Sequence, residues 1–342
     1  MLVRHTTARA LGICAFLIVP IFGVSGCASD KGLLEPIRVV DDAYNGGNAL
    51  DVSPDSRLAA SGDWAGKIRL WRLPEGNPLG GWQTSHGDLP GLMFLSGSNQ
   101  LLSAGHDGFI RIWNLSGRPV AAYDTGSSVS SFYPTHNRRG VLLGHSDGLV
   151  SYWTTEGVRL GAWQLSDRRI SAVTTDASET HYAAGDSARR VWRWHKDGLP
   201  ENLQSPPSYA RTLAFNPSDG GLLGGGWFNL FSWRAGNVQL KLLPTAHNGI
   251  VNHMQFSADG SYLASISRQT DSSVMLLNPQ TGETLAAFRK HELCGQHVAL
   301  SPDGRSMVSN SDDASVRFYL LPTSLGNNIS SGGDEVGMPE AR

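Results

Sequence analysis

Short alternating segments recur along the chain, and each ends in an aromatic or large apolar residue. In the clearest copies, Ser61–Trp71 and Ser103–Trp113, small residues and a turn precede an alternating strand. Alternation of apolar and polar positions is typical of half-buried β-strands. The seven copies end at Trp71, Trp113, Trp153, Trp194, Trp233, Leu277 and Tyr319, at spacings of 39 to 44 residues. This period predicts seven structural repeats.

Two further patterns keep the same phase. Apolar strands run into turns in segments 50–55, 213–219, 254–260 and 298–304, where Pro, Asp or Gly supplies the turn geometry. Segments 79–82, 120–123, 160–163 and 285–288 each hold an apolar residue, two small residues and an aromatic residue, which predicts an outer strand. Four strands in each repeat fit the roughly 40 to 45 residues of a propeller blade.

These repeats resemble the WD40 family over about residues 36–322. The resemblance implies an all-β, seven-bladed WD40-type β-propeller, in which a buried His, Ser, Asp and Trp often join within a blade. Blade two matches this network with His86, Ser103, Asp107 and Trp113. Blade seven matches it with His291, Ser309, Asp313 and Tyr319, the last in place of Trp.

Other blades depart from this pattern. Blade six offers His247, Ser265 or Ser267, and Asp271, but ends in Leu277. Ala65, Ala188 and Trp227 stand where blades one, four and five would carry Asp. We expect these blades to be held less firmly, whereas the fold persists because a propeller spreads its core over many blades.

The last repeat lacks an outer strand of its own. Segment 37–40 near the N-terminus has a suitable length, and we expect it to pair with blade seven and close the ring. The sequence thus predicts a signal peptide at 1–26, a linker at 27–35, the propeller at 36–322 and a disordered tail at 323–342.

The N-terminus resembles a bacterial lipoprotein signal. Arg4 and Arg9 precede an apolar run, and the segment from Val24 ends in small residues before Cys27. The resemblance implies cleavage before Cys27 and its acylation, which would anchor the protein to a membrane. Ala28 follows, and in Gram-negative lipoproteins a residue other than Asp there favours the outer membrane. The alternatives are an uncleaved signal anchor and an ordinary secretory signal peptide.

Composition narrows the possible partners. A formal net charge of −2 and the lack of a basic tract predict no nucleic-acid binding. Cys14 and Cys27 fall in the signal and at the acylation site, so Cys294 would stand alone in the mature chain. Without an intrachain disulfide, stability must come from packing.

Several candidate sites were weighed against structural roles. The segment His291–His297 contains His, Cys and His at metal-ligand spacing, but His291 matches the blade network and a fourth ligand is lacking. Gly144–Gly148 matches a nucleophile elbow, yet it opens a strand rather than a helix. We therefore predict no catalytic residue, metal or cofactor. The pairs at 138–139 and 189–190 are expected to be solvated arginines.

Two loop residues are the candidate partner-binding site. Trp64 and His106 fall between the second and third strands of blades one and two, and such loops share one rim of a propeller. The predicted function is therefore a lipid-anchored scaffold that binds other envelope proteins through this rim, on the outer membrane facing the periplasm. The alternative is an enzyme, or a protein that binds a small molecule or metal in its central channel.

Overall fold

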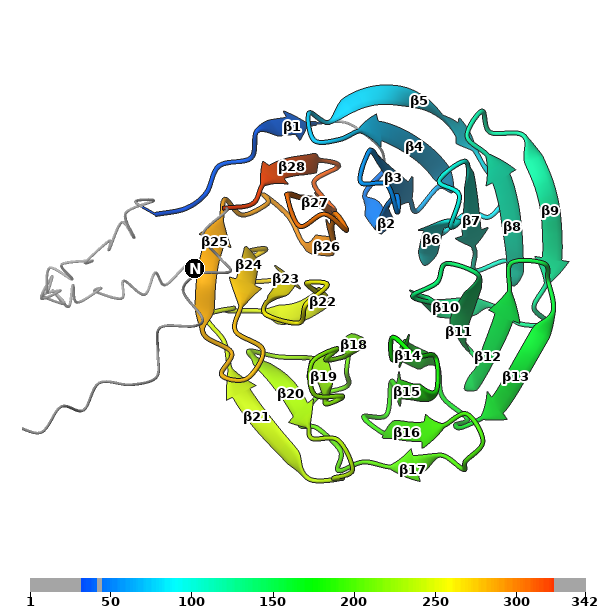
Figure 1. Ribbon diagram of the computed structural model, residues 1–342, viewed down its shortest axis with the longest axis vertical. Coiled ribbons are helices and arrows are strands. Elements are labelled where there is room, and N and C mark those ends of the chain that lie inside the picture. The colour runs from blue at the N-terminus through cyan, green and yellow to red at the C-terminus, as the bar shows by residue number, and fades with distance from the viewer. Residues whose placement is uncertain (1–31, 42–44, 323–342) are drawn as a thin grey trace, which may run out of the picture. The chain divides into compact units, whose positions relative to one another are not determined.

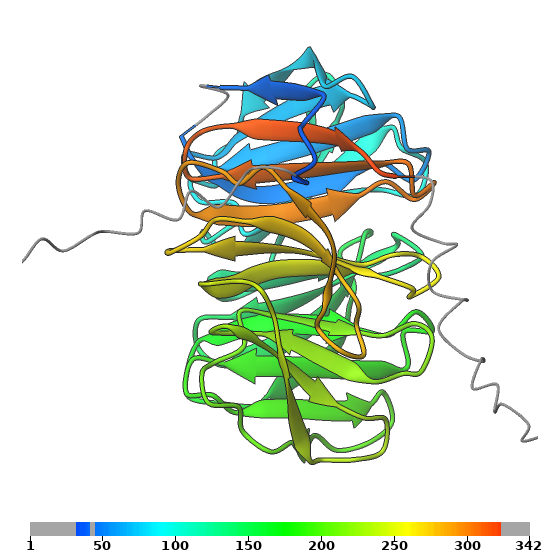
Figure 2. The ribbon, with the colours of Figure 1, turned by 90° about the vertical axis from the view of Figure 1, so that its left-hand side faces the viewer.

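The computed structural model describes residues 32–41 and 45–322. Within these ranges the chain forms 28 strands and no helix, arranged as seven four-stranded antiparallel sheets around a central axis. Figure 1 looks down the ring, and Figure 2 shows the same blades from the side. The predicted all-β, seven-bladed propeller is confirmed. The described residues include no helix long and apolar enough to span a bilayer.

Six blades each use four consecutive strands, from the channel outwards. Blade one holds β2 (Gly47–Val52), β3 (Leu58–Asp63), β4 (Lys67–Arg72) and β5 (Asn77–Gln83). Blade two holds β6 (Gly91–Phe94), β7 (Gln100–Ala104), β8 (Phe109–Asn114) and β9 (Pro119–Asp124). Blade three holds β10 (Val129–Pro134), β11 (Gly140–His145), β12 (Leu149–Thr154) and β13 (Arg159–Gln164).

The next three blades repeat this order. Blade four holds β14 (Ile170–Thr175), β15 (His181–Asp186), β16 (Val191–His195) and β17 (Glu201–Asn202). Blade five holds β18 (Thr212–Phe215), β19 (Leu222–Gly225), β20 (Asn229–Trp233) and β21 (Leu240–Pro244). Blade six holds β22 (Ile250–Phe256), β23 (Leu263–Arg268), β24 (Val274–Leu277) and β25 (Thr284–Phe288).

Blade seven joins the two ends of the described chain. It contains β26 (Gly295–Leu300), β27 (Ser306–Ser311) and β28 (Val316–Leu320), and its outer strand is β1 (Arg38–Val40). Arg38 lies opposite Phe318 in the antiparallel register, as the neighbouring blue and orange strands in Figure 1 show. The predicted closure by the N-terminal strand is confirmed, and it covers an edge that would otherwise be open.

Contacts begin slightly before the expected start of the propeller. The backbone N–H of Leu34 donates to the carbonyl of Ala287 on β25, over 2.9 Å. The incoming chain therefore touches blade six before it joins blade seven. The predicted signal peptide, Cys27, residues 27–31 of the linker and the tail at 323–342 lie outside the described residues.

The hydrophobic core lies between the blades. Seven clusters of buried side chains occur in the described residues, and each combines residues of two adjacent blades. In the cluster between blades one and two, for example, Ile68 packs with Phe94 and Trp113. Because every interface contributes its own core, the backbone can hold side chains at the channel and the rims without a separate support.

Candidate functional site

The two predicted rim residues lie at the same end of the channel. Every innermost strand runs in the same direction, so the loops between second and third strands all emerge on one rim. Trp64 is 49% exposed on this rim, and the His106 ring lies 3.1 Å from a carboxylate oxygen of Asp88. Trp64, Asp88 and His106 all line the central cavity. The structure thus brings residues of blades one and two together at the mouth of the channel.

A second pair of aromatic side chains occupies the equivalent loop of blade five. Trp227 is 37% exposed and Phe228 is 50% exposed, with their ring centroids 5.3 Å apart. The sequence marked Trp227 only as a departure from the expected Asp. Its place in a loop after the second strand, the same place as Trp64, was the signal for an interface role. We call Trp64, Trp227 and Phe228 the aromatic rim.

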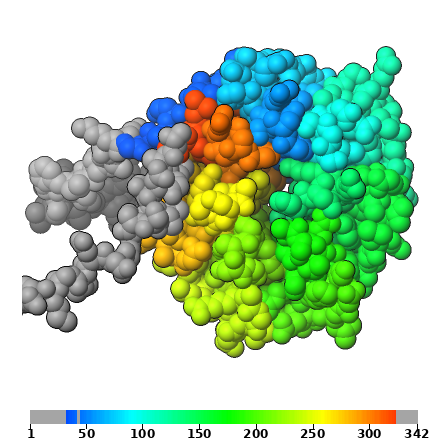
Figure 3. Space-filling view, viewed as in Figure 1, coloured from blue at the N-terminus to red at the C-terminus, as the bar shows by residue number. Residues whose placement is uncertain are grey.

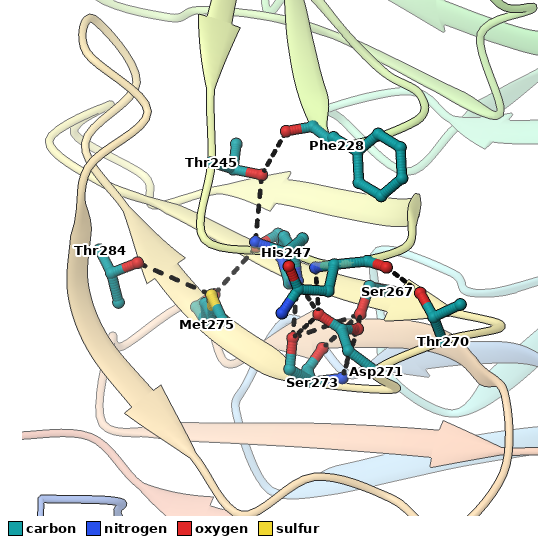
Figure 4. A network of polar contacts seen from close by, with 11 residues as sticks. Phe228, Thr245, His247, Ser267, Thr270, Asp271, Ser273, Met275 and Thr284 are labelled. Atoms are coloured by element: carbon teal, nitrogen blue, oxygen red, sulfur yellow. Dashed lines mark hydrogen bonds and ion pairs between the residues drawn. The ribbon is translucent and has the colours of Figure 1, made fainter. Parts of the chain in front are cut away.

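The backbone of Phe228 is held in an unusual conformation. Its φ of 60° is the left-handed region, which a bulky residue seldom adopts and which costs of order 1–3 kcal/mol. Its carbonyl accepts hydrogen bonds from the amide and the hydroxyl of Thr245, at 3.2 and 3.0 Å. Figure 4 shows Thr245 in turn accepting from the amide of His247, so the exposed ring is tied to the network of blade six.

The residues expected to pin blade two are joined by hydrogen bonds. The indole N–H of Trp113 donates to Ser103 Oγ over 2.8 Å, and His86 Nε2 lies 2.8 Å from the same oxygen. His86 Nδ1 lies 2.7 Å from Asp107. Burial lowers the pKa of His86, so its ring is neutral at pH 7. Burial disfavours charge on Asp107, but the bonds from His86 and Arg111 outweigh it and lower its pKa.

Blade seven builds the same network with a tyrosine. His291 Nε2 lies 2.7 Å from Ser309 Oγ, and His291 Nδ1 lies 3.3 Å from Asp313. The Tyr319 hydroxyl also hydrogen-bonds with Ser309. Although burial opposes the charge on Asp313, hydrogen bonds from His291 and Ser315 hold its pKa well below the usual range. The phenol therefore replaces the indole as a partner of the central serine.

In blade six the structure resolves the choice between two serines. His247 Nε2 lies 2.9 Å from Ser265 Oγ, and its Nδ1 lies 2.7 Å from Ser273 Oγ. Asp271 stands 3.7 Å from the same ring nitrogen (Figure 4). Ser265 is thus the partner on the second strand, and the hydroxyl of Ser273 lies between the histidine and the carboxylate.

Blades one and four are not held less firmly through lack of a carboxylate, as the sequence led us to expect. Asp63 and Asp186, two residues before Ala65 and Ala188, are fully buried and accept backbone N–H groups of the following turn. In blade three, His145 Nε2 lies 2.7 Å from Ser151 Oγ, which also accepts from Trp153. Each of these three blades therefore has a buried polar network of its own.

The arginine pairs are not simply solvated. Arg138 forms an ion pair with Asp51, whose carboxylate also accepts the amide of Phe94 over 2.7 Å. Arg190 pairs with the buried Asp186 over 2.7 Å. The sequence prediction was wrong at these two positions because turns of neighbouring strands bring each guanidinium over a buried carboxylate. Arg139 and Arg189 are exposed, as expected.

The central channel is a cavity of about 1430 Å³, and Figure 3 shows the hollow at the centre of the ring. His253 and His297 line it with ring centroids 4.6 Å apart. Burial lowers the pKa of His253 to about 4, and burial together with His253 and Arg268 lowers that of His297 further. The pair is therefore neutral at pH 7.

The structure separates the members of the predicted His-Cys-His motif. His291 lies in the network of blade seven, His297 faces the channel, and Cys294 is a partly buried free thiol. Among residues 32–41 and 45–322, no group of three or more His, Cys, Asp or Glu side chains is placed to hold a metal ion. Cys27, the predicted site of acylation, lies outside these ranges.

Comparison with known proteins identifies the repeat. The family described as WD domain, G-beta repeat, matches residues 42–72, 82–114 and 238–277. The WD repeat-containing protein 91 homolog of Dictyostelium discoideum is 31% identical over 105 residues, which cover 28% of this chain and 14% of that protein. The Notchless protein homolog of Arabidopsis thaliana is 42% identical over 65 residues, 19% of this chain and 13% of that protein.

These relatives are much longer than the stretches they share with this chain, so the likeness concerns the repeat and not their whole activity. The matched segments fall on blades one and two and on the junction of blades five and six. The other blades have the same four-stranded plan. This chain is accordingly an all-β, seven-bladed propeller that carries WD40 repeats.

Proposed function

We propose that this protein is a lipid-anchored scaffold of the cell envelope, which binds other envelope proteins through the aromatic rim. The observation that carries the proposal is the exposure of Trp64, Trp227 and Phe228 on loops of one rim. Large aromatic side chains supply much of the binding free energy of protein interfaces. Propellers with WD40 repeats generally serve as interaction scaffolds, which supports the same class of function.

The rim is also organised before a partner arrives. Phe228 is fixed by the hydrogen bonds from Thr245, and the amide of Trp227 donates to Ser208 Oγ over 3.3 Å. A side chain that is already ordered loses less conformational freedom on binding. Rings that remain exposed on so rigid a support are therefore suited to bind a protein surface.

The anchor rests on the N-terminal sequence. Acyl chains on Cys27 would hold the propeller at a membrane, in keeping with about 0.8 kcal/mol for each buried methylene group. We expect Cys27→Ser to move the protein from the membrane fraction to the soluble fraction and to abolish metabolic labelling with a radioactive fatty acid. If the variant stays in the membrane and is still labelled, the anchor at Cys27 is refuted.

The scaffold is tested by crosslinking in native membranes. Trp64→Ala combined with His106→Ala should reduce the capture of a defined envelope protein, and Trp227→Ala should do the same. Leu160→Ala is the matched control, because Leu160 is an exposed apolar residue on the outer strand β13. Equal capture by all variants that remain folded would rule out the aromatic rim as the interface.

A second candidate is supported by the cavity. Its volume of about 1430 Å³ exceeds that of a typical small-ligand site, and its wall carries the neutral imidazoles of His253 and His297. A small molecule or a metal in the channel would appear in native mass spectrometry of the purified protein. A stoichiometric ligand, without any protein partner, would favour this candidate over the scaffold.

A further inference from the structure

Three arginines from successive blades meet at the mouth of the channel. Arg169 and Arg211 directly precede the innermost strands β14 and β18, and Arg268 ends β23. The start of an innermost strand and the end of a second strand lie on the same rim, as the pairing of Ile250 with Arg268 shows. All three guanidinium-bearing residues line the cavity. We call Arg169, Arg211 and Arg268 the arginine arc; it shares its rim with the aromatic residues.

Positive charge in this arc is only partly balanced. The guanidinium of Arg211 donates to Asn252 Oδ1 over 3.1 Å and to the Tyr209 hydroxyl over 3.2 Å, and that of Arg169 donates to the Ser130 carbonyl over 3.3 Å. Neither forms an ion pair within the described ranges of the chain.

Arg268 is the third member and is also incompletely satisfied. Its nearest carboxylate, that of Asp312, stands 3.7 Å away, and its buried Nε has no hydrogen-bond acceptor. Burial, together with the charges of Arg268 and Arg169, lowers the pKa of Arg211. Like charges held together in a partly dry site are unfavourable, so an added anion would stabilise the arc.

We propose that the arginine arc binds a carboxylate on an acidic segment of a protein partner. A carboxylate fits the planar fork of a guanidinium and accepts two parallel hydrogen bonds. Tyr209 and Trp227 flank the arc, since Trp227 is bonded to Ser208 beside Tyr209, and they can contact apolar side chains next to the acidic one. This proposal rests on the proposed scaffold function and names the chemistry of its partner.

The opposite side of the mouth favours a carboxylate over a phosphate. Asp88 there pairs with His106, and Asp312 accepts from Gln296 over 2.6 Å. Burial raises the pKa of both carboxyl groups, but each remains a source of negative charge. Because repulsion grows with the charge of the ligand, a dianionic phosphate is disfavoured more than a single carboxylate. A polyanionic nucleic acid is disfavoured still further.

The first test uses a labelled heptapeptide with two adjacent glutamates between leucines, and its matched peptide with two glutamines. Fluorescence anisotropy should show binding of the glutamate peptide alone, about tenfold weaker for Arg211→Gln, as expected for the loss of one charge-assisted contact. Arg189→Gln is the matched control, because Arg189 is an exposed arginine on the same rim and does not line the cavity. Its affinity should equal that of the unchanged protein.

Other results of this assay would overturn the proposal. These are a lack of binding, equal binding of the two peptides, or an equal loss in Arg189→Gln, which would indicate diffuse attraction. A phosphoserine peptide that binds tenfold more tightly than the glutamate peptide would assign the arc to phosphate instead. Arg211→Gln should also melt at the same temperature as the unchanged protein or higher, because it relieves repulsion; a lower melting temperature would contradict the charge argument.

Crosslinking separates this proposal from the scaffold function itself. If the arc contacts the partner, Arg211→Gln should reduce partner capture as strongly as the change of Trp64 and His106. Capture that survives Arg211→Gln but falls when Trp64 and His106 are changed would preserve the scaffold and refute the acidic segment.

Discussion

The ion pair between Asp51 and Arg138 links two blades that are not neighbours. Asp51 lies on β2 of blade one, and Arg138 comes from the turn between β10 and β11 of blade three. The carboxylate also accepts the amide of Phe94 in blade two, and the guanidinium reaches the Val52 carbonyl over 3.4 Å. One salt bridge thus connects three successive blades at the end of the channel opposite the aromatic rim. We predict that Arg138→Ala destabilises the fold.

The magnitude follows from the burial of the pair. Removal of one partner of a fully buried pair costs about 3–5 kcal/mol, because the other charge is left without compensation. The side chains of Arg138 and Asp51 are 18% and 10% exposed, so water screens them slightly and about 2–3 kcal/mol is expected. With a urea m-value of about 3 kcal/mol/M for a protein of this size, the midpoint should fall by roughly 1 M.

The assay is urea unfolding followed by tryptophan fluorescence, with Arg139→Ala as the control. Arg139 is the adjacent arginine and is exposed, so its removal should change the free energy of unfolding by less than about 0.5 kcal/mol. Equal effects of the two substitutions would show that the Asp51 pair is not important for stability. The control also accounts for the loss of one positive charge from the same turn.

The pH dependence gives a second, independent check. Burial raises the pKa of Asp51, and Arg138 opposes that rise, so removal of Arg138 raises the pKa further. The folded variant then binds a proton that the unfolded chain, with an ordinary pKa, does not. Its stability relative to the unchanged protein should therefore improve as the pH falls from 7.5 to 5.5. A deficit that widens over this range would refute the account.

Three further substitutions test other parts of the structure. Ser103→Ala should lower the free energy of unfolding by about 2–4 kcal/mol, because two buried groups lose their shared partner, whereas the exposed Ser116→Ala should be neutral in the same urea assay. Val40→Asp should expose the edge of blade seven, with a lower melting temperature and larger species in gel filtration. Since burial lowers the pKa of His253 to about 4, the unfolded chain binds the proton first, and stability is lost as the pH falls from about 6.5 to 4. His253→Gln should therefore lose about 1–2 kcal/mol less between pH 7 and 5 in thermal melts.

The fold could be predicted from the sequence because each blade carries its own local signals. The spacing of the strand-ending residues gives the number of blades, and the missing outer strand after Tyr319 indicates that segment 37–40 must close the ring. Both conclusions depend on periodic patterns and need no long-range contact. The turn residues that fix the phase act within a few positions of one another.

The polar networks were harder to predict where a residue type moves along the chain. In blade two the expected residues stand at the expected spacing and meet. In blades one and four the carboxylate shifts by two positions, to Asp63 and Asp186, because a tight turn places both positions near the same backbone N–H groups. A sequence alignment treats that shift as a loss, although the three-dimensional position of the carboxylate is retained.

The channel mouth shows why a motif search fails in a propeller. Arg169 and Arg211 are 42 residues apart, one blade spacing, and each directly precedes an innermost strand. They are therefore neighbours in space because they share a phase in the repeat, while the adjacent residue Arg168 is exposed to solvent. The dipeptides at 138–139 and 189–190 drew attention because charges stood together in the sequence. In a ring of repeats, alignment of equivalent positions in successive blades is the better way to find groups that act together.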